Sequence, residues 1–198
     1  SGHGVTSALM TARLAGYLSG FTPSQNMALR RVGDGKFVAR DPAETVSDLN
    51  ELLLRELETE HYFTIALSIV DLQSGLMRTV QAGHPHPVLQ RRGQAIALLG
   101  DGGMPVGLIP KAEFTSFETQ LKPGDRVILH SDGITEAENP AGVMLEEDGL
   151  NSFLDAARDM PAPVMMDRLL ETLQAHTKTS DFGDDVSILV FDYDGPCA

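Results

Sequence analysis

The sequence predicts an α+β domain with a mostly antiparallel sheet, and three features lead to this class. Apolar residues recur at helical spacing towards both ends of the chain. The middle of the chain alternates β-branched or aromatic runs with glycine turns, as hairpin-connected strands do. With 198 residues, 42% hydrophobic and 22% charged, the chain is long and apolar enough for one folded domain. Helices at the ends of a run of hairpins favour an α+β fold over an alternating βαβ fold.

The first helix is expected from Val5 to Leu18, where apolar side chains and good helix formers repeat at helical spacing. Thr22-Pro23-Ser24 ends this pattern. The stretch from Arg31 to Arg40 holds two glycines and is interpreted as a loop or a short hairpin.

A second helix is expected from Asp41 to about Glu58. Asp41 suits the N-cap, Pro42 the first helical position and Glu44 the last position of a capping box. One apolar face then repeats at intervals of three and four, at Val46, Leu49, Leu53 and Leu57. This face would serve either the core or the interface of a homodimer.

The remaining elements follow from changes in the apolar period. Strands are expected at Tyr62–Asp71, Leu76–Ala82, Pro87–Arg91, Ala95–Leu99, Glu113–Leu121, Arg126–Ser131 and Val186–Tyr193. Gln73-Ser74-Gly75 is the turn between the first two of these strands. Two helices are expected between the last two strands, from about Leu150 to Arg158 and from Pro163 to Thr177.

The charge balance excludes some classes of function. A formal net charge of −13 repels phosphate backbones and argues against a nucleic-acid partner. No stretch approaches the ~20 apolar residues of a membrane span, and Ser1-Gly2-His3-Gly4 does not open a signal peptide. The single cysteine, Cys197, allows no internal disulfide, so a cytoplasmic setting is expected. The acidic surface serves solubility, or some of its carboxylates bind divalent cations.

Two acidic positions stand out because they fall at the ends of apolar strands. The strand Val127–His130 runs directly into Ser131-Asp132-Gly133, and Gly133 is expected to let the chain turn sharply there. Asp184 and Asp185 come just before the closing strand. If the two strands are neighbours in one sheet, Asp132 and Asp184 meet and would bind Mg²⁺ or Mn²⁺ rather than zinc. Without such a meeting, they are ordinary turn aspartates.

A second candidate metal site is the His84-x-His86 pair, which on a strand would point both rings to one face. Pro85 and Pro87 instead indicate a rigid turn, and the sequence nearby supplies no thiolate or further histidine for zinc.

The segment Pro123–Ala137 (PGDRVILHSDGITEA) closely resembles the signature of bacterial PPM-type phosphatases, relatives of protein phosphatase 2C in the SpoIIE-like branch. Further motifs match in order: Gly2-His3-Gly4 before a helix, Ala82-Gly83-His84-Pro85, Met104–Leu108, and Asp184-Asp185-Val186-Ser187. Five such motifs in the right order span almost the whole chain.

The resemblance implies an antiparallel β-sandwich with helices on both faces and two manganese or magnesium ions between the sheets. These ions activate a water that attacks phosphoserine or phosphothreonine directly. Asp132 and Asp184 resemble two of the metal ligands, with Asp185 a third. Gly2, His3, Gly4 and Gly133 would shape the loops of the site, and no residue is assigned as catalytic acid or base.

The resemblance also implies residues before Ser1. The bacterial pattern, Asp-x-x-Gly-His-Gly, places a bridging aspartate two positions upstream of Ser1, together with the first strands of the sandwich. A receiver or sensor domain further upstream, as in two-component response regulators, is expected in the parent protein.

Two functions are compatible with this sequence. The first is a metal-dependent phosphatase acting on a phosphorylated regulatory protein, such as an anti-sigma-factor antagonist. The second is a catalytically silent adaptor with the same fold. The pair Asp132 and Asp184 favours the enzyme, because an adaptor has no physical need for paired carboxylates at strand ends.

Overall fold

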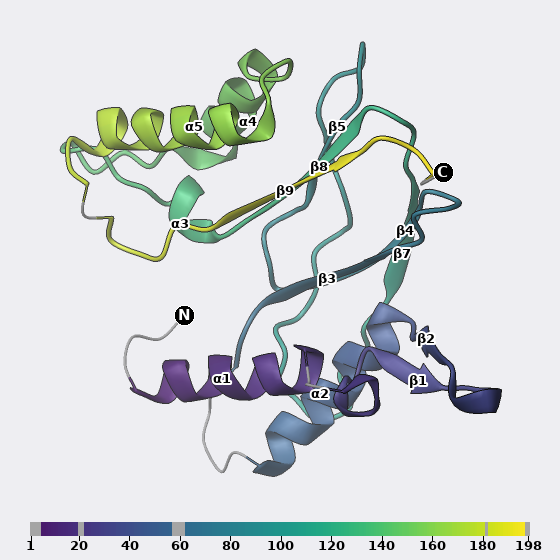
Figure 1. Cartoon of the computed structure of the whole chain (residues 1–198). Helices are drawn as coiled ribbons and strands as arrows, with labels where there is room; N and C mark the ends of the chain where they lie inside the picture. Colours follow the sequence, from purple (N-terminus) through teal and green to yellow (C-terminus); the bar gives the residue numbers. More distant parts are fainter. Residues whose placement is uncertain (1–4, 20–21, 57–61, 181, 197–198) are drawn as a thin grey trace. The chain divides into compact units, whose positions relative to one another are not determined.

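The computed structural model describes residues 5–19, 22–56, 62–180 and 182–196, and its elements follow the predicted order (Figure 1). The chain divides into two compact units, described separately below. The first comprises Ser1–Val70, Met77–Gly83 and Gly103–Thr119, and the second Asp71–Leu76, His84–Gly102 and Gln120–Ala198. Within the described residues, no helix combines the length and apolarity needed to cross a membrane.

The first unit is built around two antiparallel sheets, one of two strands (β1-β2) and one of three in the order β3-β4-β7. Its elements are α1 (Val5–Ser19), β1 (Leu29–Arg31), β2 (Phe37–Ala39), α2 (Pro42–Glu56), β3 (Ile65–Val70), β4 (Leu76–Ala82) and β7 (Ser116–Gln120), the last two each with one end residue in the other unit. Of the two alternatives for Arg31–Arg40, a loop or a short hairpin, the structure shows the hairpin, formed by β1 and β2. Strand β3 pairs with β4 in register from Ile65↔Ala82 to Val70↔Met77.

Helix α2 confirms most of the pattern predicted for it. The Asp41 carboxylate accepts a hydrogen bond from Ala43 N at 2.8 Å, as an N-cap does. Glu44 lies against Arg40, with its carboxylate 3.7 Å from the guanidinium. Val46 and Leu49 are buried in the core of this unit, with Val80 and Ala82 of β4 and with Val106. Leu57 lies outside the described residues, and a homodimer through this helix stays a prediction.

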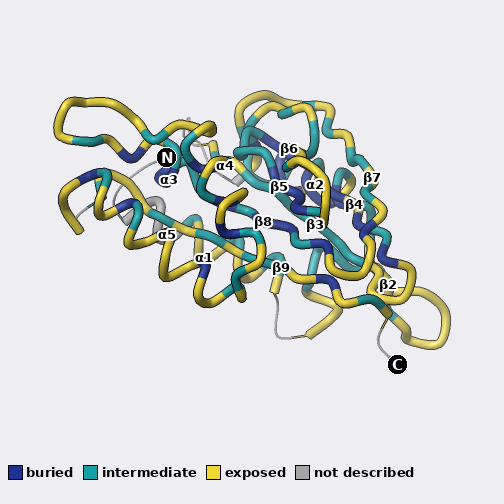
Figure 2. Tube along the Cα trace, turned by 90° about the horizontal axis from the view of Figure 1, so that it is seen from above, coloured by how far each residue is buried: buried dark blue, intermediate teal, exposed yellow. Residues whose placement is uncertain are grey.

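The second unit holds a four-stranded antiparallel sheet in the order β6-β5-β8-β9. Its elements are β5 (Val88–Gln90), β6 (Ala97–Leu98), β8 (Asp125–His130), α3 (Asp132–Thr135), α4 (Glu146–Ala156), α5 (Ala162–Thr177) and β9 (Ile188–Tyr193). All three residues of the interior strand β5 are buried, as are most of those of β4 in the other unit (Figure 2). The buried residues include the polar Thr79 and Gln81 of β4 and Gln90 of β5 as well as apolar side chains.

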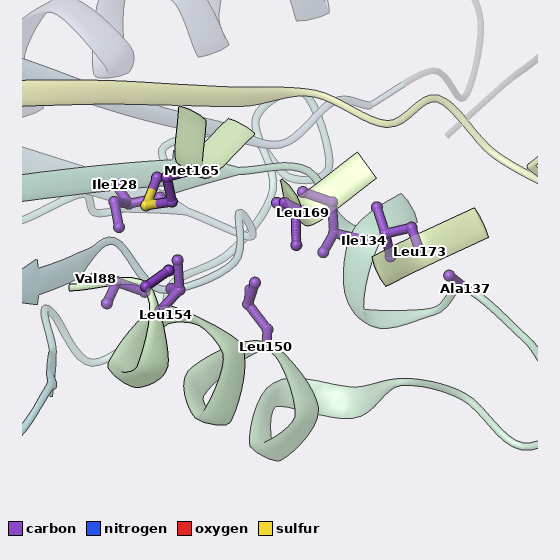
Figure 3. Packing of buried hydrophobic residues seen from close by; sticks show 10 residues of the cluster. Val88, Ile128, Ile134, Ala137, Leu150, Leu154, Met165, Leu169 and Leu173 are labelled. Carbon is purple, nitrogen blue, oxygen red and sulfur yellow. The ribbon is translucent and has the colours of Figure 1, made fainter. Parts of the chain in front are cut away.

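The core of the second unit explains why α4 and α5 form where the helical period appears. Leu150 and Leu154 of α4, and Leu169 and Leu173 of α5, are spaced four residues apart and point into one cluster (Figure 3). Val88 and Ile128 bring the sheet to the same cluster, together with Met165 and Ile134. Full burial of each such side chain contributes roughly 1.5–3 kcal/mol.

The predicted α+β class with antiparallel sheets is confirmed, although several strands are shorter than expected and two helices differ from expectation. Helix α4 begins at Glu146, four residues before the predicted start, and Glu147 and Asp148 lie in its first turn, where the helix dipole favours acidic groups. Glu146 itself has a left-handed φ of 61°. The one-turn helix α3, which directly follows β8, was not predicted.

Candidate metal centre

The two predicted acidic loops lie at the same edge of the second unit's sheet. Strands β8 and β9 are antiparallel neighbours, paired from Asp125↔Tyr193 to His130↔Ile188. The end of β8 therefore lies opposite the start of β9, which places Asp132 and the Asp184-Asp185 pair on adjacent loops. The sequence left open whether the two strands that carry these loops are neighbours in one sheet, and the structure shows that they are.

The Ser131 side chain joins the two loops. Its Oγ donates a hydrogen bond to the Asp185 carbonyl oxygen at 2.8 Å and accepts one from Ser187 N at 2.9 Å. Its backbone N–H donates to the Ser187 carbonyl oxygen, also at 2.9 Å. We call these three hydrogen bonds the Ser131 clasp. They hold the backbone before Asp132 against the backbone that flanks Asp185.

Gly133 has a different role from the one expected. The chain does turn after β8, into the one-turn helix α3, but Gly133 has a φ outside the left-handed region, so the turn does not depend on its conformational freedom. A Cβ at this position would lie 2.5 Å from the Asp185 carbonyl oxygen and 3.0 Å from its carbonyl carbon. Gly133 is therefore required by the close approach of the second loop.

The three carboxylates sit on these loops with much of their surface open. Asp132 is half-buried at the start of α3, whereas Asp184 and Asp185 are exposed. One oxygen of Asp132 accepts from Gly133 N at 3.1 Å, and one of Asp184 accepts from Asp185 N at 2.7 Å. Across the described part of the chain, no three acidic, histidine or cysteine side chains form a ready metal-binding group. The structure brings the two loops together without converging all three carboxylates.

Other predicted residues fall elsewhere. Gly2, His3 and Gly4 lie outside the described residues. His84 and His86 lie on the turn between β4 and β5, and each ring Nδ1 is 3.1 Å from a backbone carbonyl oxygen, those of Pro85 and Leu99. The two histidines thus lie between the strands, where the prolines indicated a turn, and not on a strand.

Sequence reasoning missed His130, the last residue of β8. Its side chain is 5% exposed, and burial lowers the pKa of the imidazole below its usual value. Its Nδ1 lies 3.1 Å from the Ser131 carbonyl oxygen. Only its position directly before Ser131-Asp132 could have indicated from the sequence that it lies near the candidate site.

A pocket of about 400 Å³ opens beside the two loops. Gly133 and Asp184 line it, and its other walls include Glu136 and Glu138. Met144 and Phe182 add apolar surface. The pocket thus combines carboxylates with apolar side chains and adjoins the residues predicted to bind metal.

Comparison with known proteins places this geometry in a family. The family model for stage II sporulation protein E (SpoIIE) matches residues 1–194. The chain belongs to the SpoIIE family. It is 26% identical over 150 residues to stage II sporulation protein E of Bacillus subtilis (strain 168), a match that covers 76% of this chain and 18% of that protein. It is also 24% identical over 191 residues to the phosphoserine phosphatase RsbP of the same organism, covering 96% of this chain and 43% of that protein.

The fold agrees with that of the SpoIIE family. The SiaA-PP2C domain of Pseudomonas aeruginosa superposes with a TM-score of 0.78 at 20% identity, covering 98% of this chain and 73% of that one. This likeness shows that the chain has the fold of PP2C-type phosphatase domains. The chain spans less than half the length of both curated relatives.

Proposed function

We propose that this chain is a metal-dependent phosphatase domain that removes phosphate from phosphoserine or phosphothreonine of a regulatory protein. The observation that carries the proposal is the meeting of two acidic loops, Ser131-Asp132-Gly133 and Asp184-Asp185, at neighbouring strand ends. The family match and the relative named as a phosphoserine phosphatase support the same chemistry.

The residues of the two loops fit manganese or magnesium in chemical type. Carboxylates are hard oxygen donors, which these ions prefer, and the pocket that Gly133 and Asp184 line opens beside them. Asp132 and Asp184 would each supply ligands, with Asp185 a third. The resemblance adds an aspartate two positions before Ser1, which would complete a site for two ions. When bound, such ions supply an activated water and neutralise charge on the phosphoryl group.

The chain's own residues position the substrate and the ligands. The clasp fixes the spacing of the two loops, so metal binding would require the carboxylate side chains, rather than the backbone beneath them, to rearrange. The adjoining pocket, with Glu136 and Glu138 on its wall, would accept basic or apolar side chains beside the phosphorylated residue. We infer that the substrate is a phosphorylated protein of the anti-sigma-factor-antagonist class.

The test is Mn²⁺-dependent release of phosphate from a phosphoserine peptide by the full-length protein. Asp132→Asn and Asp184→Asn should each lower the rate at least about 100-fold, because losing a direct ligand exceeds the 10–100-fold effect of losing an outer-shell partner. Asp167→Asn, on the exposed face of α5, is the matched control and should retain the wild-type rate.

Two results would contradict the proposal. One is equal activity in the wild type and in both ligand variants, which would remove these aspartates from the site. The other is no phosphate release with Mn²⁺ or Mg²⁺ from a folded wild-type protein, which would favour the silent adaptor instead.

A further inference from the structure

We propose that Ser131 is a positioning residue that sets the affinity of the site for divalent metal. This inference rests on the proposed function, because it concerns the same two loops. Ser131 is not a metal ligand in this scheme. It acts through the backbone on which Asp132, Asp184 and Asp185 are mounted.

The Ser131 hydroxyl acts as donor and acceptor at once. Oγ is a donor to the Asp185 carbonyl and an acceptor from the Ser187 N–H, so it holds the backbone on both sides of Val186. An alanine provides neither bond. A threonine retains both, because its hydroxyl occupies an equivalent position on Cβ.

The clasp and Gly133 act on the same backbone segment. Ser131 draws the Asp185 carbonyl towards the end of β8, and the absence of a side chain on Gly133 leaves room for that carbonyl to approach. Asp132 lies between Ser131 and Gly133 in the sequence, and Asp184 precedes Asp185. The relative position of the two ligand-bearing backbones is therefore set by contacts immediately beside both ligands.

Because this region is exposed, the effect of Ser131 on metal affinity can be measured separately from its effect on stability. Asp185 and Ser187 are exposed, so water can replace the bonds of a lost hydroxyl and the fold loses little stability. Metal binding depends on the spacing of both loops at once, and water does not restore that spacing. Loss of outer-shell partners typically weakens metal affinity 10–100-fold.

The experiment is isothermal titration of Mn²⁺ into the full-length protein, alongside thermal unfolding in the absence of metal. Ser131→Ala should bind Mn²⁺ about 10-fold more weakly, at the lower end of that range, with a melting temperature within roughly 2–4 °C of the wild type. Ser131→Thr should recover affinity to within about threefold of the wild type, since the hydroxyl is restored. Ser152→Ala, an exposed serine on α4, is the matched control and should bind as the wild type does.

The outcomes separate the two proposals. A wild type that binds no Mn²⁺ contradicts the proposed function itself. A wild type that binds, with equal affinity in Ser131→Ala, overturns only the positioning role. A loss of affinity that Ser131→Thr does not recover, accompanied by a matching loss of thermal stability in both variants, also overturns it, because the residue would then be structural.

Discussion

Replacing Gly133 with alanine tests the close approach of the two acidic loops. The substitution adds one methyl group to α3, where alanine is the better helix former by up to ~1 kcal/mol. In an isolated helical turn the substitution would therefore stabilise the helix. Here the new Cβ would lie 2.5 Å from the Asp185 carbonyl oxygen, whereas ordinary contacts begin near 3.4 Å.

The magnitude follows from this shortfall of about 0.9 Å, which either α3 or the Asp185 backbone must absorb. Overpacking of this kind costs typically 1–3 kcal/mol. Because Asp185 is exposed and can yield, we expect the lower part of that range, a net loss of about 1–2 kcal/mol and of roughly 3–6 °C in melting temperature. Mn²⁺ affinity should fall as well, since the yielding residue adjoins Asp184.

The assay is urea unfolding of the full-length protein with and without Mn²⁺. Gly183→Ala is the matched control, because a Cβ there meets no atom within 4 Å and its φ lies outside the left-handed region. That control should change stability by no more than about 0.5–1 kcal/mol, in the stabilising direction. If Gly133→Ala proved as stable as Gly183→Ala and bound Mn²⁺ as tightly as the wild type, the reasoning would be refuted.

Two further predictions concern stability. The Arg91 guanidinium pairs with Asp125, whose side chain is 2% exposed, so Arg91→Met would leave a buried carboxylate without its counter-charge. Because the Arg91 side chain is itself 21% exposed, we expect the free energy of unfolding in urea to fall by about 2–4 kcal/mol. A loss below about 1 kcal/mol would contradict this prediction. Hydrogen bonds from the backbone N–H groups of Gln73 and Ser74 lower the pKa of Asp71. The stability that Asp71 adds is therefore present above its unfolded pKa of about 3.9 and lost as pH falls through the lower folded pKa. The gap between wild type and Asp71→Ala should accordingly shrink from pH 6 to pH 3, and a constant gap would show that another group is responsible.

The aspartates of the candidate site were identifiable from sequence because each follows or precedes an apolar strand. Ser131 and His130 were not singled out, because their roles depend on distant partners. The hydroxyl of Ser131 bonds to residues 54 and 56 positions away, and no local spacing indicates such a contact. The burial of His130 likewise depends on what packs around the end of β8.

Gly133 also shows the difference between what local sequence indicates and what distant contacts decide. Its presence after Asp132 suggested a turn, since glycine most often relieves a local dihedral constraint. The structure shows that glycine is needed because any side chain here would clash with the Asp185 carbonyl, a distant contact that local backbone dihedrals do not reveal.

By itself the sequence determined the four longer helices, most of the strands, the turn at Gly75 and the family resemblance, because periodicity, capping and glycine geometry are properties of neighbouring residues. Only the tertiary structure decided the strand order β6-β5-β8-β9, the meeting of Asp132 with the Asp184 loop, and the clasp between them. These features depend on which distant segments pack together. That choice is made by burying the shared core of α4, α5 and the sheet, which no single stretch of the chain specifies.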